Sequence, residues 1–486
     1  MHPDLSPDLC ARLRAAFLTA GYTADGVVTA LGVQAHAALG RGEPEAARRA
    51  SRDAGHLGTL IRLFLLGDAE PESAVRAAFG PVDLADAVAN EVVTADGRAG
   101  LDIRPYEDSW WVVADLDADQ RGGAVPADHV LGVGHASVNL ARATARRPVG
   151  TVLDVGTGCG VQALHASTHA RAITATDLSP RALALARGTF LLNEVDVELA
   201  QGEWFAPVGE RRFDQVVCNP PFVVGPPRVD YVYRDSGLAG DDASALVVGR
   251  MPACLTEGGV GQLLASWLHR RGEDWADRVT SWLPTGVDAW FVQRDVADPA
   301  LYVGTWLRDA GVDPRSAEGR AKAGAWLDWF AEQKVEAVGF GYVTLRRTDE
   351  ADTTVVCEDL RHAYDDPLGP AAAQWLDSVA WLRRHGDDLM RTRFTVPPSV
   401  VLEEVAMPAE DGWATVVRRL HRTDGPGWQH ELDEPTTKLL AGCRGALPLE
   451  DLLALLEFAY TDLDPAAALP VVRDLVLHGM LVPVTD

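Results

Sequence analysis

Residues 151–160 read TVLDVGTGCG and residues 213–222 read FDQVVCNPPF, and these two stretches decide the fold. In each, a short apolar run of strand-forming residues passes into a turn, which is glycine-rich in the first and proline-rich in the second. Strands covered by helices on both faces have such continuous apolar runs. Ligands of open parallel sheets bind outside the carboxyl ends of the strands. The two turns therefore predict neighbouring sites at one edge of a doubly wound α/β sheet.

The glycine-rich turn predicts the first site. Gly156, Gly158 and Gly160 would let the backbone, including Thr157, pass close to a ligand before a helix begins. Asp154 lies near the carboxyl end of the strand, where its carboxylate would accept hydrogen bonds from loop amides or from a ligand ammonium. Enzymes that bind dinucleotides use similar turns, so this turn alone does not define the class of ligand.

Acidic and aromatic residues follow the next two predicted strands. Asp177, with Leu178 after it, ends the second strand and is placed to take both hydroxyls of a ribose, as in sites for nicotinamide dinucleotides or S-adenosylmethionine. After the third strand, Glu203 would accept from an adenine amino group, and the Trp204 amide would donate to the ring. Packing in the core is an equally open interpretation of Trp204 and Phe205.

The proline-rich turn narrows the chemistry to a nitrogen acceptor. Pro220 and Pro221 fix the backbone after the fourth strand and remove two donors. The Asn219 side-chain oxygen and the Pro220 carbonyl would then accept both hydrogens of one planar NH2 group and stabilise the positive charge that grows on its nitrogen. Phe222 would stack on the plane that carries this nitrogen. We predict that these four residues are catalytic.

The motifs LDVGTG at 153–158, DLSP at 177–180, GEWF at 202–205 and NPPF at 219–222 resemble those of the HemK/PrmC-type methyltransferases. These are class I enzymes of the small-domain group, and the resemblance extends over roughly residues 131–347. It implies a Rossmann-like seven-stranded core that binds S-adenosyl-L-methionine. The residues expected to contact this cofactor are Asp154, Gly156, Thr157, Gly158, Gly160, Asp177, Leu178, Glu203, Trp204 and Asn219.

The resemblance predicts an S-adenosylmethionine-dependent N-methyltransferase with a macromolecular acceptor. A protein glutamine amide is favoured, because a formal net charge of −26 opposes non-specific binding to nucleic acid. N6-adenine in ribosomal RNA, transfer RNA or DNA is the alternative, since the NPPF motif does not separate the two acceptors. A third possibility is a binding module that keeps the fold without catalysis. The oligomeric state is left open.

Composition indicates where the protein acts. The six cysteines are scattered, without the spacing of a metal site or a disulfide framework, and a reducing cytoplasm fits them best. Neither a signal peptide nor an apolar run of membrane-spanning length is evident. We therefore predict a cytoplasmic protein that uses no metal and has no membrane partner.

The chain divides into three predicted domains. Residues 1–122 combine short helices with a hairpin and suggest a winged-helix-like domain. Residues 123–348 form the methyltransferase domain, and residues 349–486 form an accessory α+β domain that also suggests a winged helix. Within the central domain, the loop at 223–242 lies where the acceptor must enter. Its Arg228, Tyr231, Tyr233, Arg234 and Asp235 would contact the acceptor or face solvent.

Overall fold

The structure is a computed structural model that describes residues 3–117, 120, 126–227, 236–361, 367–410, 412–460 and 465–484. The chain separates into two compact units. The larger unit comprises Met1–Ala141 and Arg147–Cys357, and the C-terminal unit comprises Arg142–Arg146 and Glu358–Asp486. The domain limits at residues 122 and 348 stay a prediction.

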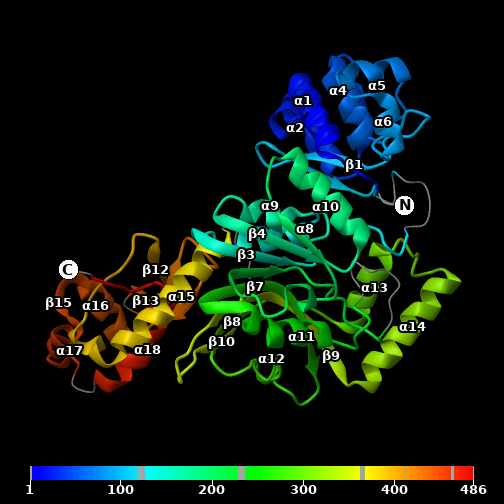
Figure 1. Cartoon of the computed structure of the whole chain (residues 1–486). Coiled ribbons are helices and arrows are strands. Elements are labelled where there is room, and N and C mark those ends of the chain that lie inside the picture. Colours follow the sequence, from blue (N-terminus) through cyan, green and yellow to red (C-terminus); the bar gives the residue numbers. More distant parts are fainter. Residues whose placement is uncertain are drawn as a thin grey trace. The chain divides into compact units, whose positions relative to one another are not determined.

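An eight-stranded sheet forms the centre of the larger unit (Figure 1). Its order from one edge is β5-β4-β3-β6-β7-β9-β8-β10. The strands are β3 (Val149–Val155), β4 (Ala170–Asp177), β5 (Glu198–Gln201), β6 (Phe213–Cys218), β7 (Leu255–Arg270), β8 (Val287–Ala297), β9 (Val335–Arg347) and β10 (Val355–Asp359). The ladder from β5 to β7 is parallel, whereas β9 runs antiparallel to both β7 and β8. This confirms the Rossmann-like α/β core and adds β10 as an unpredicted eighth strand.

Helices connect these strands along the chain. The helical segments are α9 (Val161–Ala166), α10 (Pro180–Leu192), η2 (Ala206–Val208), α11 (Asp242–Arg250), η3 (Met251–Cys254), α12 (Trp275–Thr280), α13 (Pro299–Asp309) and α14 (Ala317–Glu332). The α10 helix is capped by Ser179, whose hydroxyl accepts a hydrogen bond from the Ala182 amide at 3.2 Å, and Pro180 occupies its first position. The pair α13–α14 lies between β8 and β9 as an insert.

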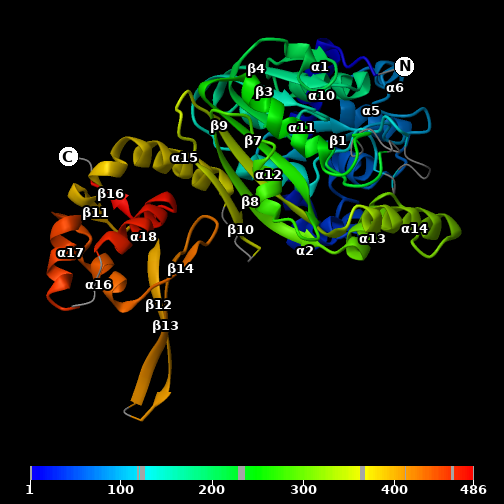
Figure 2. The same ribbon diagram turned by 90° about the horizontal axis from the view of Figure 1, so that it is seen from below.

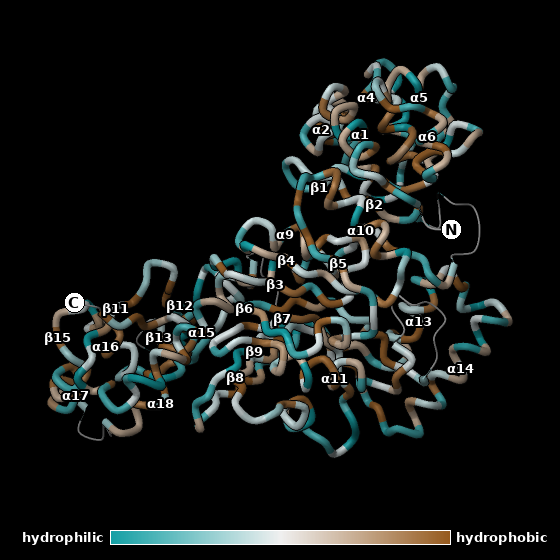
Figure 3. The backbone as a smooth tube through the Cα atoms, viewed as in Figure 1, coloured by the Kyte–Doolittle hydropathy of each residue, from teal (hydrophilic) through white to brown (hydrophobic). Residues whose placement is uncertain are grey.

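Apolar side chains fill the sheet from both sides. Leu153, Val216 and Leu263, on the neighbouring strands β3, β6 and β7, are fully buried. Figure 3 shows hydrophobic stretches along β6 and β7 in the middle of the sheet. Side chains inside the strands face the covering layers, so a ligand can reach the sheet only where the strands end, at its edge.

The N-terminal part packs onto the sheet's own helices. Its elements are α1 (Pro7–Ala20), α2 (Ala24–Gly40), α3 (Pro44–Ala50), α4 (Gly55–Leu60), η1 (Ile61–Leu65), α5 (Glu72–Phe79), α6 (Leu84–Ala89) and the hairpin strands β1 (Asp102–Tyr106) and β2 (Trp110–Ala114). The Trp111 amide donates to Asn193 Oδ1 at 3.0 Å, and Asn193 Nδ2 donates back to the Trp111 carbonyl at 2.7 Å. Thr189 Oγ1 accepts from the Val113 amide at 3.0 Å. These bonds fix the predicted hairpin on α10.

Among the described residues, no single helix is long and apolar enough to cross a membrane. The pair α1 and α2, bent by 43°, passes that test of length and composition only when both helices are taken together. Leu13 and Phe17 of α1 are fully buried in the unit's own core. A cytoplasmic location stays a prediction.

The C-terminal unit has the predicted α+β composition. Its helical segments are α15 (Leu368–His385), η4 (Gly386–Arg391), α16 (Glu434–Gly442), α17 (Leu449–Glu457) and α18 (Pro465–Leu477). Its strands are β11 (Arg393–Thr395), β12 (Val400–Ala409), β13 (Gly412–Arg422), β14 (Gln429–Glu431), β15 (Arg444–Pro448) and β16 (Val482–Pro483). They form two three-stranded sheets, of order β15-β11-β16 and β12-β13-β14.

Candidate active site

The two turns that decide the fold lie side by side. Strands β3 and β6 are parallel neighbours, with Val155 paired to Cys218. The glycine-rich turn and the NPPF turn therefore leave the same edge of the sheet at the same level. The two turns therefore adjoin each other as predicted, and their roles as ligand sites stay predictions.

The glycine-rich turn borders open space. Gly156 and Gly158 have φ of 72° and 56°, and a Cβ added at either would meet no heavy atom within 4 Å. A Cβ at Gly160 would instead come within 2.8 Å of the Phe190 ring, so this glycine serves the packing of α9 on α10. The first two glycines thus leave a cradle over which a ligand would pass close to the backbone.

Asp154 is buried behind this turn. Its Oδ2 accepts from the Thr157 hydroxyl at 2.6 Å and from the Ala163 amide at 3.1 Å, which ties the turn to α9. Burial raises the pKa of this carboxyl to about 7. Oδ1 is buried and has no hydrogen-bond partner within the part of the chain that the structure describes. Asp154 therefore keeps one acceptor for a donor that comes from outside.

Asp177 closes the other side of the turn. Its two oxygens accept from the Gly158 amide at 2.9 Å and the Ser179 amide at 2.8 Å, and burial raises the pKa of its carboxyl. Leu178 beside it leaves 55% of its surface exposed. The carboxylate oxygens retain further lone pairs, so the expected ribose contact stays a prediction.

In the segment after β5, some side chains are exposed and others pack in the core. Glu203 is exposed, whereas Phe205 is buried in the core cluster that also contains Val208 and Phe213. Trp204 is partly buried against the same cluster and has φ of 49°, a backbone conformation that is uncommon outside glycine. Core packing is confirmed for Phe205. The adenine contacts of Glu203 and Trp204 stay predictions.

Asn219 presents an unused acceptor. Its Nδ2 donates to the Ser137 hydroxyl at 3.4 Å, from the helix α8 (His135–Ala143). The Ser137 carbonyl in turn accepts from Gln162 Nε2 at 2.8 Å. This chain of contacts sets the rotamer of Asn219, and its Oδ1 is buried with no hydrogen-bond partner among the described residues. A buried acceptor left unpaired costs about 1–3 kcal/mol, so a ligand donor at this atom would recover that loss.

Phe222 lies in an aromatic surround. Its ring centroid is 5.1 Å from that of Phe340 on β9 and 6.3 Å from that of Trp306 on α13. Its backbone carbonyl accepts from the Ser266 hydroxyl of β7 at 2.5 Å. The ring and the backbone of the motif's last residue are therefore held from three different elements.

The insert helices hold the chain that leaves the motif. The Val224 amide donates to the Tyr302 hydroxyl at 2.7 Å, and the Trp326 indole donates to the Val224 carbonyl at 3.0 Å. Trp326 also packs with Phe330, and its contact with Val224 was not predicted. No local pattern reveals it, because the partners lie 78 and 102 residues apart.

The Gly225 carbonyl accepts from the Gly240 amide at 2.9 Å, which closes the base of the predicted acceptor loop. The loop residues Arg228, Tyr231, Tyr233, Arg234 and Asp235 lie outside the described residues. Three contacts on Val224 and Gly225 thus fix where this loop begins and ends.

The residues present fit the expected cofactor and acceptor. Asp154 Oδ1 and Asn219 Oδ1 are buried, unpaired acceptors that follow adjacent strands, next to a glycine cradle. Asp154 Oδ1 suits a cationic amine, and Asn219 Oδ1 suits a planar NH2 group. Within the described ranges no three His, Cys, Asp or Glu side chains are grouped to hold a metal ion.

Family models match three parts of the chain. Residues 132–234 match the methyltransferase small domain. Residues 19–104 and 373–483 match two families that are each described as a domain of unknown function, DUF7059 and DUF7782. The small-domain match contains both turns and every residue that the sequence predicts to bind the cofactor.

Curated relatives each match a limited part of the chain. The release factor glutamine methyltransferase of Deinococcus radiodurans is 40% identical over 100 residues, which is 20% of this chain and 34% of the relative. That of Geobacter sulfurreducens is 31% identical over 159 residues, or 28% and 55% of the two chains. The ribosomal protein uL3 glutamine methyltransferase of Bradyrhizobium diazoefficiens is 35% identical over 105 residues, or 21% and 32%. The chain spans about half the length, or less, of these relatives.

Among solved structures, an S-adenosylmethionine-dependent methyltransferase from Thiobacillus denitrificans, in complex with S-adenosyl-L-homocysteine, is similar. It has 18% identity and a TM-score of 0.26, and the match covers 44% of this chain and 92% of that one. A likeness of this size adds nothing to what the order of the strands already shows about the fold.

Proposed function

We propose that the protein methylates a planar NH2 nitrogen, on the premise that residues 132–234, which match the methyltransferase small domain, bind S-adenosylmethionine. The favoured acceptor is the side-chain amide of a protein glutamine. The observation that carries the proposal is the buried, unpaired Oδ1 of Asn219 beside the glycine cradle. An acceptor in this position would hold an N–H of the incoming NH2 group, so that the nitrogen lone pair faces the methyl donor.

The protein's own groups bind and orient the two reactants. When bound, S-adenosylmethionine supplies an electrophilic methyl group on a sulfonium sulfur. The glycine cradle, Asp154 and Asp177 would hold it, with Leu178, Glu203 and the Trp204 backbone around the adenine and ribose. Asn219 Oδ1 and the Pro220 carbonyl would accept the two hydrogens of the NH2 group, and Phe222 would stack on its plane. The methyl group would pass from the sulfonium sulfur, which leaves as a neutral thioether, to the nitrogen that Asn219 and Pro220 hold, and the surplus proton would leave that nitrogen for water.

The acceptor oxygens favour the transition state over the substrate. Positive charge grows on the nitrogen during transfer, so hydrogen bonds from its two N–H groups strengthen in the transition state. Asn219 is fixed by Ser137 before any substrate binds, which lowers the cost of orienting it. The proposed rate enhancement therefore comes from position and electrostatics, without a strong base.

Two observations favour glutamine over adenine. The matching curated relatives are named glutamine methyltransferases, and the net charge of −26 opposes contact with a polyanion. N6-adenine remains the second candidate, because its amino group is also planar and suits the same acceptors. A non-catalytic module is disfavoured by the intact NPPF turn.

Radiolabelled S-adenosylmethionine, incubated with the protein and a cell lysate, separates the two acceptors. Label that survives nuclease and is lost to protease supports the glutamine proposal. Label that is lost to nuclease moves the assignment to adenine. A lysate that gains no label above the Asn219→Ala control contradicts methyl transfer altogether.

Alanine at Gly158 is expected to abolish tight cofactor binding without unfolding the protein. Its φ of 56° is unfavourable for alanine by about 1–2 kcal/mol, and the new Cβ would enter the open cradle. We expect the dissociation constant for S-adenosylmethionine, measured by calorimetry, to rise at least about tenfold.

Gly209→Ala is the matched control for this variant. Gly209 has φ of 57°, and a Cβ there also meets nothing within 4 Å, but it lies outside the predicted site. Both variants should lose similar stability, and only Gly158→Ala should lose affinity. Equal affinities in the two variants would show that the cradle does not hold the cofactor.

Phenylalanine at Tyr302 is expected to impair methyl transfer while cofactor affinity stays unchanged. The change removes the acceptor of the Val224 amide, which costs about 1–3 kcal/mol and loosens the backbone two residues after Phe222. We expect kcat/KM for the acceptor to fall about tenfold. Tyr460→Phe, which removes an exposed 3.1 Å bond to Glu434, serves as the control. Parallel losses of cofactor affinity and kcat/KM would contradict a role in positioning the motif.

A further inference from the structure

The C-terminal unit carries a long two-stranded arm. Strands β12 and β13 pair with each other to form the arm. Val400 faces Arg422 at the root of the arm, and Ala409 faces Gly412 at its tip. Figure 2 shows this ribbon extending beyond the helices of its own unit. Every residue that the structure describes from Glu403 to Val416 is exposed, so neither face of the outer arm is covered. An isolated two-stranded ribbon is only marginally stable in water.

The outer arm is apolar where a solvated arm would be polar. Trp413 near the tip is 76% exposed, and Val405, Met407 and Val416 are exposed as well. Pro408 faces Trp413 across the ribbon. Exposed apolar side chains gathered on one element mark a contact surface or a liability to aggregation.

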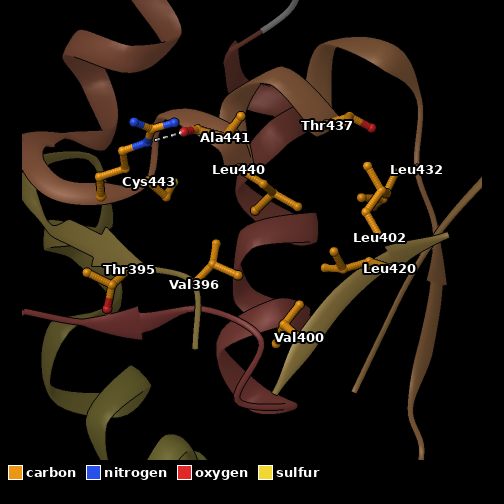
Figure 4. A pocket seen from close by; sticks show the side chains of 11 residues that line it. Thr395, Val396, Val400, Leu402, Leu420, Leu432, Thr437, Leu440, Ala441 and Cys443 are labelled. Atoms are coloured by element: carbon orange, nitrogen blue, oxygen red, sulfur yellow. Dashed lines mark hydrogen bonds between the residues drawn. The ribbon is translucent and has the colours of Figure 1, made fainter. Parts of the chain in front are cut away.

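A pocket of matching character lies at the root of the same arm. A cavity of about 470 Å³ opens between the root of the ribbon and helix α16 (Figure 4). Its lining is mainly apolar and includes Val396, Val400, Leu402, Leu420, Leu432 and Leu440. The C-terminal unit therefore carries two apolar features. We call the tip of the arm around Trp413 the knob, and we call this pocket the socket.

The knob cannot reach its own socket, because β12 separates them. This strand has 10 residues, and at about 3.3 Å per residue the tip lies roughly 30 Å from the root. We propose that two copies of the chain exchange arms, with Trp413 of each copy seated in the socket of the other. Two identical ribbons that lie antiparallel about a two-fold axis bring each tip to the other's root, so both contacts form together.

Charge complementarity supports the same arrangement. Arg444 lines the socket, and its Nε donates to the Ala441 carbonyl at 3.1 Å, but no acidic partner is found for it among the described residues. Glu410, at the tip of the arm, is exposed and likewise has no ion pair within the described ranges. Seating Trp413 in the partner's socket would bring Glu410 of one copy close to Arg444 of the other.

The arginines of the arm are paired with glutamates across the ribbon, so the arm presents no unbalanced basic surface to a nucleic acid. Glu404 binds Arg418 at 3.0 Å, and Glu403 binds Arg419 at 3.2 Å. The arm thus carries mainly apolar side chains toward its tip and charge pairs nearer its root.

The surface area of a stable dimer interface also requires the two arms to contact each other along their length. A buried tryptophan removes about 150–250 Å² from water, so two of them supply only part of the roughly 1,200 Å² of a stable interface. On the face that carries Trp413, the side chains of Pro408, Ala406 and Thr415 must supply much of the remainder, since Val405 and Met407 lie on the opposite face. The exchange therefore predicts contact along the arms and not at the tips alone.

Sedimentation equilibrium of the full chain tests the exchange. We expect the wild type to be dimeric, and Trp413→Ala to raise the dimer dissociation constant roughly a thousandfold, because two hot-spot tryptophans are lost together. Phe458→Ala is the matched control, since Phe458 is 90% exposed but lies on neither arm nor socket. A wild type that is monomeric at all concentrations would overturn the proposal, as would equal effects of the two variants.

Charge reversal shows whether the arm and the socket come from different copies. Glu410→Arg and Arg444→Glu should each weaken the dimer, and the double variant should restore it. A mixture of Trp413→Ala and Arg444→Glu chains should dimerise more tightly than either alone, because the mixed pair keeps one intact contact. Additive losses in the double variant, or no gain on mixing, would contradict the exchange.

Discussion

Replacing Asn219 by alanine is expected to lower kcat about 10²–10³-fold and to leave the affinity for S-adenosylmethionine close to that of the wild type. The change removes the buried Oδ1 that the structure leaves without a partner in the described part of the chain. A preorganised group of this kind contributes this much when it acts on charge that develops in the transition state. The glycine cradle, which we propose holds the cofactor, stays as it is.

Asn219→Asp separates the loss of an acceptor from a change of shape. Aspartate keeps an oxygen at the position of Oδ1, and its second oxygen would accept from the Ser137 hydroxyl that now receives Nδ2. This variant should retain much more activity than Asn219→Ala in single-turnover assays. Full activity in the alanine variant, or equal losses in both variants, would refute the proposed role of Oδ1.

Replacing Asp154 by asparagine is expected to change how stability depends on pH in the cofactor-free protein. Burial raises the pKa of the Asp154 carboxyl from 3.8 to about 7. Between these values the folded state binds a proton that the unfolded state does not, so stability falls as pH rises through this window. The stabilisation is complete below about pH 4 and lost above about pH 7, in total about 4 kcal/mol.

Asparagine resembles the protonated carboxyl and keeps an oxygen for Thr157 and Ala163. Relative to the wild type, the variant should therefore gain about 4 kcal/mol in unfolding free energy between pH 4 and pH 8. Urea unfolding at several pH values measures this difference. Parallel pH profiles for the two proteins would show that Asp154 does not titrate in this range.

The core of the fold was predictable because its strands are buried on both faces. Runs such as Val152–Val155 carry an apolar signal that does not depend on distant partners. Strand β10 was missed because Val355–Asp359 is only partly buried and ends in two acidic residues. Its assignment depends on pairing at the edge of the sheet, which no local pattern records.

The length of the arm escaped prediction for a similar reason. The strand-like runs at 400–405 and 413–420 are the parts whose composition favours a strand, and the paired ribbon continues to Ala409 and Gly412. Exposed residues show no alternation of buried and solvent-facing positions. Backbone pairing extends the strands beyond the point where the pattern ends.

The candidate site also combines residues that local sequence patterns predict with residues that only long-range contacts bring there. Asp154, Asp177 and Asn219 were found because each ends a recognisable strand, and the sheet brings these ends together. Tyr302 and Trp326 were not assigned to the site, since they reach Val224 from an insert far along the chain. Residues that position a motif through long-range contacts leave no trace in the motif itself.

The atom that receives the methyl group is the most direct test of the account. S-adenosylmethionine labelled with ¹³C in its methyl group, turned over with a cell lysate, allows that atom to be read from the methyl resonance of the digested product. We predict an N-methyl group on a carboxamide, and its absence when Asn219→Ala replaces the wild type. A methyl group on carbon, oxygen or sulfur, or on an amine that is not planar, would contradict the central claim.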